Sequence, residues 1–212
     1  RRLQGGRTQL CFVTLDDRGD RHFTGRGPDA SLSLGVQDIH PALFEEVKAL
    51  VITCGSLRTR QGVYAVERAI QANRGLLVCD PGICPPEWCD PQVMRRRLWG
   101  VFMRCDLLKC SDHETYWLVD EDGPMKAAQA FVREGVKCAV VTCGEAGAVW
   151  ATKTSSGRVD SPHVPIVDTT GAGDAFMSAI VARLTVEEAP PSTIPPQRLE
   201  AHLAFSCHIG AL

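Results

Sequence analysis

One short stretch combines small residues with a carboxylate in a way that suits phosphoryl chemistry. Residues 168–176 read Asp-Thr-Thr-Gly-Ala-Gly-Asp-Ala-Phe, follow an apolar strand-like run and open an apolar helical pattern. Glycines let a ligand approach the backbone closely, and the first N–H groups of a helix have no partner inside the helix and lie at its positive end. Such a turn binds an anion such as phosphate, and Asp174 is placed to take the proton of an attacking hydroxyl.

Two other interpretations of this stretch stay open. In the simpler one, Asp174 is an ordinary carboxylate at a helix start and the glycines only make a turn. In the other, Gly171 and Gly173 begin a dinucleotide-binding pattern, although Phe176 stands where that pattern has its third glycine. The next acidic residues also come too early to bind a ribose. A P-loop is absent, because the sequence has no Gly-x-x-x-x-Gly-Lys-Ser/Thr string.

Length and composition narrow the class of protein. The chain has 212 residues, 44% of them hydrophobic, and a net charge of -2, which fits one globular domain and gives no sign of a nucleic-acid or anionic-membrane partner. No apolar run approaches the ~18 residues of a membrane-spanning helix. Most of the ten cysteines lie in apolar runs without metal-ligand spacing. We therefore expect buried free thiols and a reducing compartment, either the cytoplasm or, if a targeting segment is missing, a plastid.

Short apolar runs alternate with amphipathic segments along most of the chain. Strands are predicted at 51–54, 76–79, 106–109, 139–142 and 148–151, and helices at 41–49, 61–73, 91–99, 124–134, 173–184 and 197–210. This alternation predicts an α/β fold built of βαβ units around a mainly parallel central sheet. Residues 8–26 precede it and indicate a small β-hairpin around the turn at 16–20.

Several of the predicted strands end in residues that suit a ligand site. A parallel sheet binds its ligands beyond the carboxyl ends of its strands. We therefore expect one crevice to be lined by the segments that follow the strands, which are 55–56, Asp80, 109–114, 142–147 and 168–174.

The stretch at 168–176 resembles the C-terminal signature of the ribokinase/PfkB carbohydrate kinases, and other segments match that family in the same order. They are Phe12–Asp16 with Gly19–Phe23 and then Arg26-Gly27-Pro28, Gly55-Ser56-Leu57, Asp80-Pro81 with Pro86 and Trp88, Asp106–Glu114, and Thr142–Gly147. The first of these is similar to the lid hairpin of fructokinases, the group that the chain resembles most. The resemblance implies one partial kinase domain over residues 1–212, a ribokinase-like three-layer sandwich with a β lid at 8–26.

The resemblance also implies roles for particular residues. Asp174 is the expected catalytic base, with the amides of Gly171, Ala172 and Gly173 as an anion hole. The expected nucleotide-binding residues of the family's Thr-x-Gly-x-x-Gly turn are Thr142, Gly144 and Gly147. Lys109 is added to them from its place at the end of a predicted strand, where it is expected near the phosphates or else at the surface. The expected metal-binding residues are Glu114, which acts on Mg²⁺ through water, and Asp168 with Thr170, which in the family often help to hold a monovalent cation such as K⁺.

The expected reaction is transfer of the γ-phosphoryl group of ATP to a sugar hydroxyl, with fructose as the first candidate and fructose 6-phosphate as its product. Asp174, Phe12 and Arg26 are the candidate sugar-binding residues. The lid would close over the sugar and exclude water. Because an exposed strand edge pairs readily with another strand, a homodimer formed through the lid is a further hypothesis.

The sequence also departs from the family pattern. Gly82 and Cys84 stand where fructokinases have Asn and Arg, and Ser31 stands where they usually have Asp. The family's first strand, which carries a sugar-binding Asp, has no counterpart, so we expect a chain truncated at both ends. Two alternatives stay open: a kinase of this family that acts on ribose, ketodeoxygluconate or a nucleoside, and an inactive fructokinase-like scaffold protein.

Overall fold

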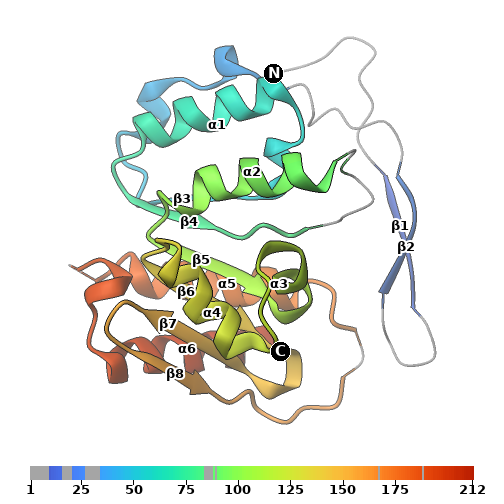
Figure 1. Cartoon of the computed structure of the whole chain (residues 1–212), viewed down its shortest axis with the longest axis vertical. Coiled ribbons are helices and arrows are strands. Elements are labelled where there is room, and N and C mark those ends of the chain that lie inside the picture. Colours follow the sequence, from blue (N-terminus) through green and yellow to red (C-terminus); the bar gives the residue numbers. More distant parts are fainter. Residues whose placement is uncertain are drawn as a thin grey trace.

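Six strands form one sheet at the centre of the molecule (Figure 1). The computed structural model describes residues 10–15, 21–26, 34–83, 88, 90–166, 168–187 and 189–212. The strands lie side by side in sequence order and are β3 (Ala49–Ile52), β4 (Leu76–Cys79), β5 (Leu107–Ser111), β6 (Cys138–Thr142), β7 (Ala148–Thr152) and β8 (Ser156–Val159). Neighbours from β3 to β6 are parallel, whereas β7 and β8 are antiparallel. The prediction of a mainly parallel sheet is therefore confirmed.

Helices cover both faces of the sheet, which makes three layers. The first face packs against α1 (Arg60–Ala72), α2 (Pro91–Phe102) and α4 (Pro124–Arg133), and the second packs against α5 (Ala172–Leu184) and α6 (Pro196–Gly210). A short helix, α3 (Asp112–Leu118), follows β5 directly. Proline occupies the first turn of α2, α4 and α6, where its missing N–H costs no helical hydrogen bond.

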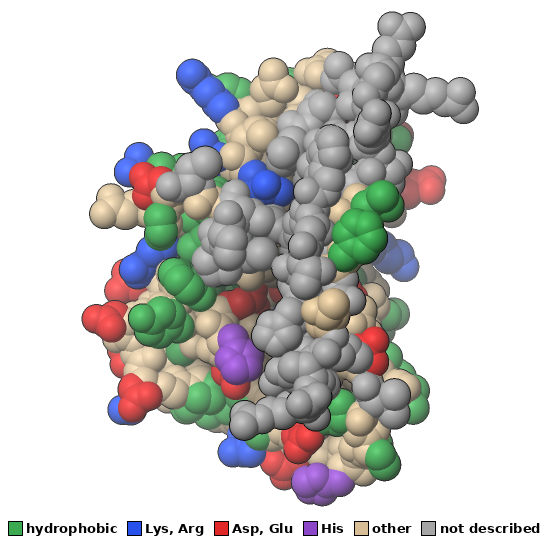
Figure 2. All heavy atoms as spheres, turned by 90° about the vertical axis from the view of Figure 1, so that its right-hand side faces the viewer, with side chains coloured by type: hydrophobic (Ala, Val, Ile, Leu, Met, Phe, Trp, Pro, Cys, Tyr) green, Lys and Arg blue, Asp and Glu red, His purple; other side chains and the backbone are tan. Residues whose placement is uncertain are grey.

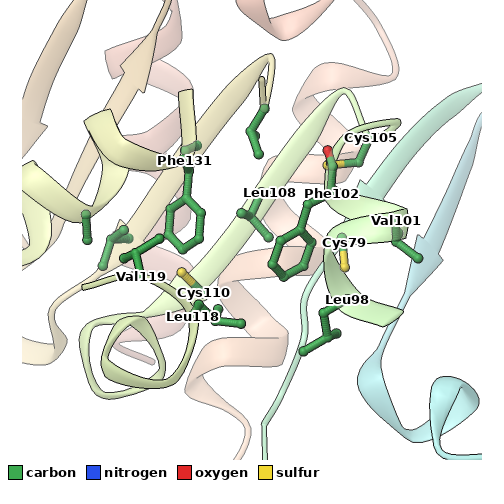
Figure 3. Close-up of a cluster of buried hydrophobic side chains, with 14 of the residues drawn as sticks. Cys79, Leu98, Val101, Phe102, Cys105, Leu108, Cys110, Leu118, Val119 and Phe131 are labelled. Atoms are coloured by element: carbon green, nitrogen blue, oxygen red, sulfur yellow. The ribbon is translucent and has the colours of Figure 1, made fainter. Parts of the chain in front are cut away.

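The strands divide their side chains between two separate cores, because successive residues of a strand point to opposite faces. In β4, Leu77 and Cys79 belong to the core beneath α1, α2 and α4, whereas Val78 belongs to the core beneath α5 and α6. Figure 3 shows the first core, in which Phe102 of α2 and Phe131 of α4 lie over Leu108 of β5. The two phenyl rings meet edge to face with centroids 6.1 Å apart.

A two-stranded hairpin stands to one side of this body (Figure 1). It consists of β1 (Cys11–Leu15) and β2 (Arg21–Arg26), which are antiparallel, with an irregularity between Phe12 and Val13. The predicted hairpin is thus confirmed, while the predicted turn at 16–20 lies outside the described residues.

The structure corrects several local predictions. The helix expected at 41–49 is wrong: Pro41–Phe44 forms only a short 3₁₀ helix, and β3 begins at Ala49, two residues before the predicted strand. The apolar run at 164–167, expected as a strand before the Gly-rich turn, is not a strand over its described residues, 164–166. Pro165 lies in it and Pro162 just before it, and proline offers no backbone donor to a ladder.

Seven cysteines whose side chains the structure describes are free thiols, and six of them are buried. This confirms the expectation for that part of the chain. Burial raises the pKa of the Cys138 thiol to about 12, so this side chain acts as a small apolar group. In the described part of the chain, none of the helices has the length and apolar character that crossing a membrane requires.

The aromatic contact between α2 and α4 generates a stability prediction. Phe102 is fully buried, and Phe102→Ala should lower the free energy of unfolding by about 3–5 kcal/mol through lost apolar burial and the cavity left behind. Urea denaturation monitored by circular dichroism measures this change. Leu43, which is 64% exposed, provides the matched control, and Leu43→Ala should stay within about 0.5 kcal/mol of the unsubstituted chain. Equal losses in the two variants would contradict this description of the core.

Candidate active site at the carboxyl ends of the strands

The segments that follow β3, β4 and β5 are tied together by hydrogen bonds at one edge of the sheet. The Cys54 amide donates to the Pro81 carbonyl at 2.8 Å, which joins the segment after β3 to the segment after β4. The Ile83 amide donates to Glu114 Oε1 at 2.6 Å, which joins the segment after β4 to α3. The predicted convergence of these segments on one region is therefore confirmed.

The turn at 171–174 has the form of an anion site. Gly171 has φ +87° and caps α5, a left-handed conformation that favours glycine. The Ala175 amide donates to the Gly171 carbonyl at 2.8 Å. For the amides of Gly173 and Asp174, no partner occurs among the described residues. These two N–H groups lie at the positive end of α5, beside the exposed Asp174 side chain.

A buried ion pair lies beneath this turn. Lys109, on β5, and Asp80, directly after β4, are 5% and 8% exposed, and Lys109 Nζ is 3.0 Å from Asp80 Oδ2. A Cβ atom built on Gly173 would come within 3.2 Å of the same Nζ and meet nothing else within 4 Å. The ammonium of Lys109 therefore contacts the inner side of the turn that precedes Asp174.

The register of the sheet explains why these two residues meet. Val78 of β4 is paired with Leu107 of β5, so the residues two positions further along each strand, Asp80 and Lys109, lie opposite each other on the same face. Because Leu107 belongs to the core beneath α5 and α6, Lys109 also points to the side of α5.

The ionisation of Asp80 reflects its surroundings. Burial raises the pKa of Asp80 from 3.8 to about 6, against the opposing effect of the Lys109 ammonium, and the charges of Glu114 and Asp174 raise it further. Three carboxylates thus interact around one buried ammonium.

Glu114 holds two loops together through its carboxylate. Oε2 accepts from the Ser111 amide at 2.7 Å and from the Ser111 hydroxyl at 2.9 Å, and Oε1 accepts from the Ile83 amide. An ionised carboxylate has about four acceptor positions, so three are filled by protein donors. This fits the expected contact with Mg²⁺ through water better than direct coordination. Within the described ranges, no group of three or more His, Cys, Asp or Glu side chains could hold a metal ion.

The turn after β6 leaves its backbone open to a ligand. The Cys143 amide donates to the Gly147 carbonyl at 2.8 Å, and the Gly147 amide donates to the Gly144 carbonyl at 3.0 Å. Gly147 has φ +85°, and a Cβ atom there would come within 2.0 Å of the Val159 carbonyl oxygen, so glycine is required. Gly144 is exposed with open space around its Cα. Thr142 ends β6 beside β5, because its hydroxyl donates to the Cys110 carbonyl at 3.3 Å.

The remaining predicted site residues are less closely gathered. Asp168 Oδ1 accepts from the Thr170 amide at 2.8 Å, so these two expected cation ligands are adjacent to the anion turn. Phe12 lies on β1 with its side chain 63% exposed, and Arg26 ends β2. Figure 2 shows the face beside this hairpin, where described side chains of both charge signs are interspersed.

The sequence reasoning assigned no role to Asp80 or Ser111, although it placed both near the crevice. A signal for Asp80 was present: it follows β4 at the position that faces a lysine once the two strands are aligned. Ser111 and Glu114 form a capping box, Ser-x-x-Glu, at the start of α3. That pattern also predicts α3. The helix has only seven residues, which are too few to show a helical period of apolar side chains.

Comparison with known proteins fixes the family. The model of the pfkB family carbohydrate kinases matches residues 1–212, and the chain belongs to this family. Fructokinase-2 from Zea mays is 32% identical over 213 residues, which are 97% of this chain and 62% of the maize protein. Fructokinase-2 from Solanum lycopersicum is 31% identical over 216 residues, which cover 99% and 65% of the two chains. The chain spans less than two thirds of the length of these curated relatives.

Solved structures confirm the ribokinase-like fold. A fructokinase from Vibrio cholerae, in a form with bound fructose, ADP and calcium ion, superimposes with a TM-score of 0.82 at 26% identity over 98% of this chain and 67% of that one. A fructokinase with bound ATP from Xylella fastidiosa gives a TM-score of 0.83 at 23% identity, again over 98% and 67% of the chains.

The raised pKa of Asp80 predicts a pH dependence of stability. Its pKa is about 6 when folded and near 3.8 when unfolded, so between these values the folded chain binds more protons than the unfolded chain. The free energy of unfolding must then fall as pH rises through this window. Compared with Asp80→Asn, the unsubstituted chain should lose about 2 kcal/mol between about pH 4 and pH 7. Urea denaturation at several pH values measures the difference, and a constant difference would contradict the buried, raised carboxyl.

Proposed function

We propose that this chain is the greater part of an ATP-dependent sugar kinase that transfers the γ-phosphoryl group to a sugar hydroxyl. The observation that carries the proposal is the position of Asp174, an exposed carboxylate at the start of α5, where the amides of Gly173 and Asp174 have no partner among the described residues. A base and an anion site at one point are what transfer of a phosphoryl group to an alcohol requires, since the protein mostly positions the reactants and neutralises charge.

In the proposed reaction, Asp174 accepts the proton of the attacking hydroxyl. The expected anion hole of Gly171, Ala172 and Gly173 is adjusted at one position, because the Ala172 amide already donates to the Thr169 carbonyl at 3.2 Å. The amides of Gly171, Gly173 and Asp174 donate hydrogen bonds to the oxygens of the transferring group. Thr142, Gly144 and Gly147 line the nucleotide phosphates with a turn whose backbone a ligand can approach. Mg²⁺ bound with ATP would neutralise phosphate charge, and Glu114 would hold water of its hydration shell. Asp168 and Thr170 would help to hold a monovalent cation, K⁺, next to the turn.

Fructose is the proposed sugar, with fructose 6-phosphate as the product. Support comes from the fructokinase names of relatives at about 30% identity and from the fructose-bound Vibrio cholerae neighbour. The hairpin β1–β2 would close over the sugar, with Phe12 and Arg26 as contacts, and exclude water that would otherwise hydrolyse ATP. For the compartment we propose the cytoplasm, which the free thiols favour. A plastid is the alternative, since a 30% identical Arabidopsis thaliana relative is described as chloroplastic.

Removal of the proposed base gives the direct test. Asp174→Asn should reduce fructose-dependent release of ADP from Mg²⁺ and ATP by a factor of about 10² to 10⁴, the usual contribution of general base catalysis. Ser178, an exposed residue about one turn further along α5, supplies the control. Ser178→Ala should keep the rate of the unsubstituted chain. Ribose, ketodeoxygluconate and adenosine should be tried in parallel. A folded chain without turnover on any of these acceptors would favour the alternative of an inactive scaffold.

The hairpin also predicts an assembly. The strands β1 and β2 form a two-stranded sheet of their own. Each strand pairs with the other along one edge, and its second edge is not part of that pairing. Such edges pair with further strands, so we propose a homodimer in which two hairpins join. Sedimentation equilibrium at micromolar concentration should give twice the mass of one chain, and replacement of Thr14 on β1 by proline should shift it towards a single mass. A single-chain mass for the unsubstituted protein would exclude this assembly.

A further inference from the structure

The ammonium of Lys109 occupies a position that the fold alone does not favour. Lys109 is 5% exposed, and its Nζ lies against Gly173 in the first turn of α5. The start of a helix carries partial positive charge, so a cation there is repelled. Burial of a charged group also costs free energy unless the charge is paired, and this ammonium is paired with Asp80. The repulsion by the helix start is not removed by that pairing, and it would be offset if an anion were bound at the turn.

Asp80 is the group that holds the ammonium in place. Its Oδ2 is 3.0 Å from Lys109 Nζ, and this is the hydrogen bond of the Lys109 side chain recorded in the described structure. Asp80 is itself buried and follows β4, so neither partner can move far without breaking the sheet register. The other charged groups that interact with Asp80 are Glu114 and Asp174, both acidic. Lys109 is thus a buried positive charge held in place by Asp80, with the carboxylates of Glu114 and Asp174 interacting with the same aspartate.

We propose that Asp80 is a positioning residue that holds Lys109 beneath the turn at 171–174, so that the ammonium strengthens the binding of phosphate at that turn by its charge. The phosphate site then has two parts: the amides of the turn on the outer side and the strand-borne cation on the inner side. This inference deepens the proposed function and rests on it.

The role of Gly173 follows from the same geometry. Its missing side chain leaves room for the ammonium, because a Cβ atom would lie 3.2 Å from Nζ and would touch no other atom within 4 Å. Apart from its own helix and chain neighbours, the Cβ of Gly173→Ala would therefore meet the Lys109 side chain, which would have to shift by a few tenths of an ångström. The backbone at Gly173 does not have a positive φ, so alanine is compatible with the local conformation.

Calorimetric titration with the non-hydrolysable ATP analogue β,γ-imido-ATP in the presence of Mg²⁺, and separately with adenosine, tests the inference, because the analogue carries the γ-phosphate that would occupy the turn. Lys109→Met, which keeps the length of the side chain but removes the charge, should raise the Kd for the analogue about tenfold or more. The Kd for adenosine, which has no phosphate, should be unchanged. Asp80→Asn separates position from charge, because its amide oxygen still accepts from the ammonium while the neutralising charge is gone. Its Kd for the analogue should equal that of the unsubstituted chain or be lower.

A purely structural ion pair predicts a different pattern. In that case Lys109→Met and Asp80→Asn would both weaken binding of the ATP analogue and of adenosine to similar extents, and this result would overturn the inference. Gly173→Ala gives a second test that keeps both partners. Introduced alone it should weaken binding of the ATP analogue, but it should cause little further change when combined with Lys109→Met. Additive losses in the double variant would also overturn the inference.

The outcome can be separated from that of the proposed function, which is tested by turnover. Sugar-dependent turnover with an unchanged Kd for the ATP analogue in Lys109→Met would support the kinase and exclude the role of the pair. The predicted contrast between the ATP analogue and adenosine in a chain without turnover would support the phosphate site and exclude kinase activity of this chain.

Discussion

The register between the parallel strands β4 and β5 is the constraint on which the site depends. Val78 lies opposite Leu107, and both side chains enter the core beneath α5 and α6. Because side chains alternate along a strand, a slip of one residue in β4 would turn Asp80 to the face opposite Lys109. Both faces of these strands bury apolar side chains, so the observed register, and not the apolar pattern alone, is what makes Asp80 face Lys109. The charged pair is carried at the ends of strands whose hydrophobic residues take no part in the chemistry.

Hydrogen bonds at the strand ends then fix the positions of the loops that follow the strands. Glu114 joins the amides of Ser111 and Ile83, so that a helix start and a loop from the neighbouring strand share one carboxylate. Gly82, in that loop, has φ +55°, a left-handed conformation in which asparagine is also tolerated. The family resemblance leads one to expect asparagine here, and the glycine of this chain adopts the left-handed conformation without strain.

The sequence predicted those helices and strands in which the pattern of apolar residues alone shows which side chains are buried. The strand at 76–79 has four apolar residues in a row and was predicted with its observed bounds, as expected for a strand buried on both faces. The strand β8 was missed, because Ser156-Gly157-Arg158 is polar and lies at the edge of the sheet. The helix at 41–49 was predicted from an apolar pattern, but Pro41 starts only one 3₁₀ turn before β3 begins. For the site, the motif located Asp174 and its turn, whereas the pairing of Asp80 with Lys109 depends on a register that single-strand patterns do not contain.

The cost of the buried pair bears on whether the chain is an enzyme or a scaffold. A buried ion pair adds little stability over well-packed apolar side chains, since desolvation of both charges offsets their attraction. Burial outweighs the Lys109 ammonium in setting the pKa of Asp80, which is raised to about 6, so ionisation of this carboxyl works against folding. A protein that needed only this fold would be served as well by two apolar residues at these positions. The pair is better understood through what its charge does at the start of α5, where a phosphate would turn an unfavourable arrangement into a favourable one.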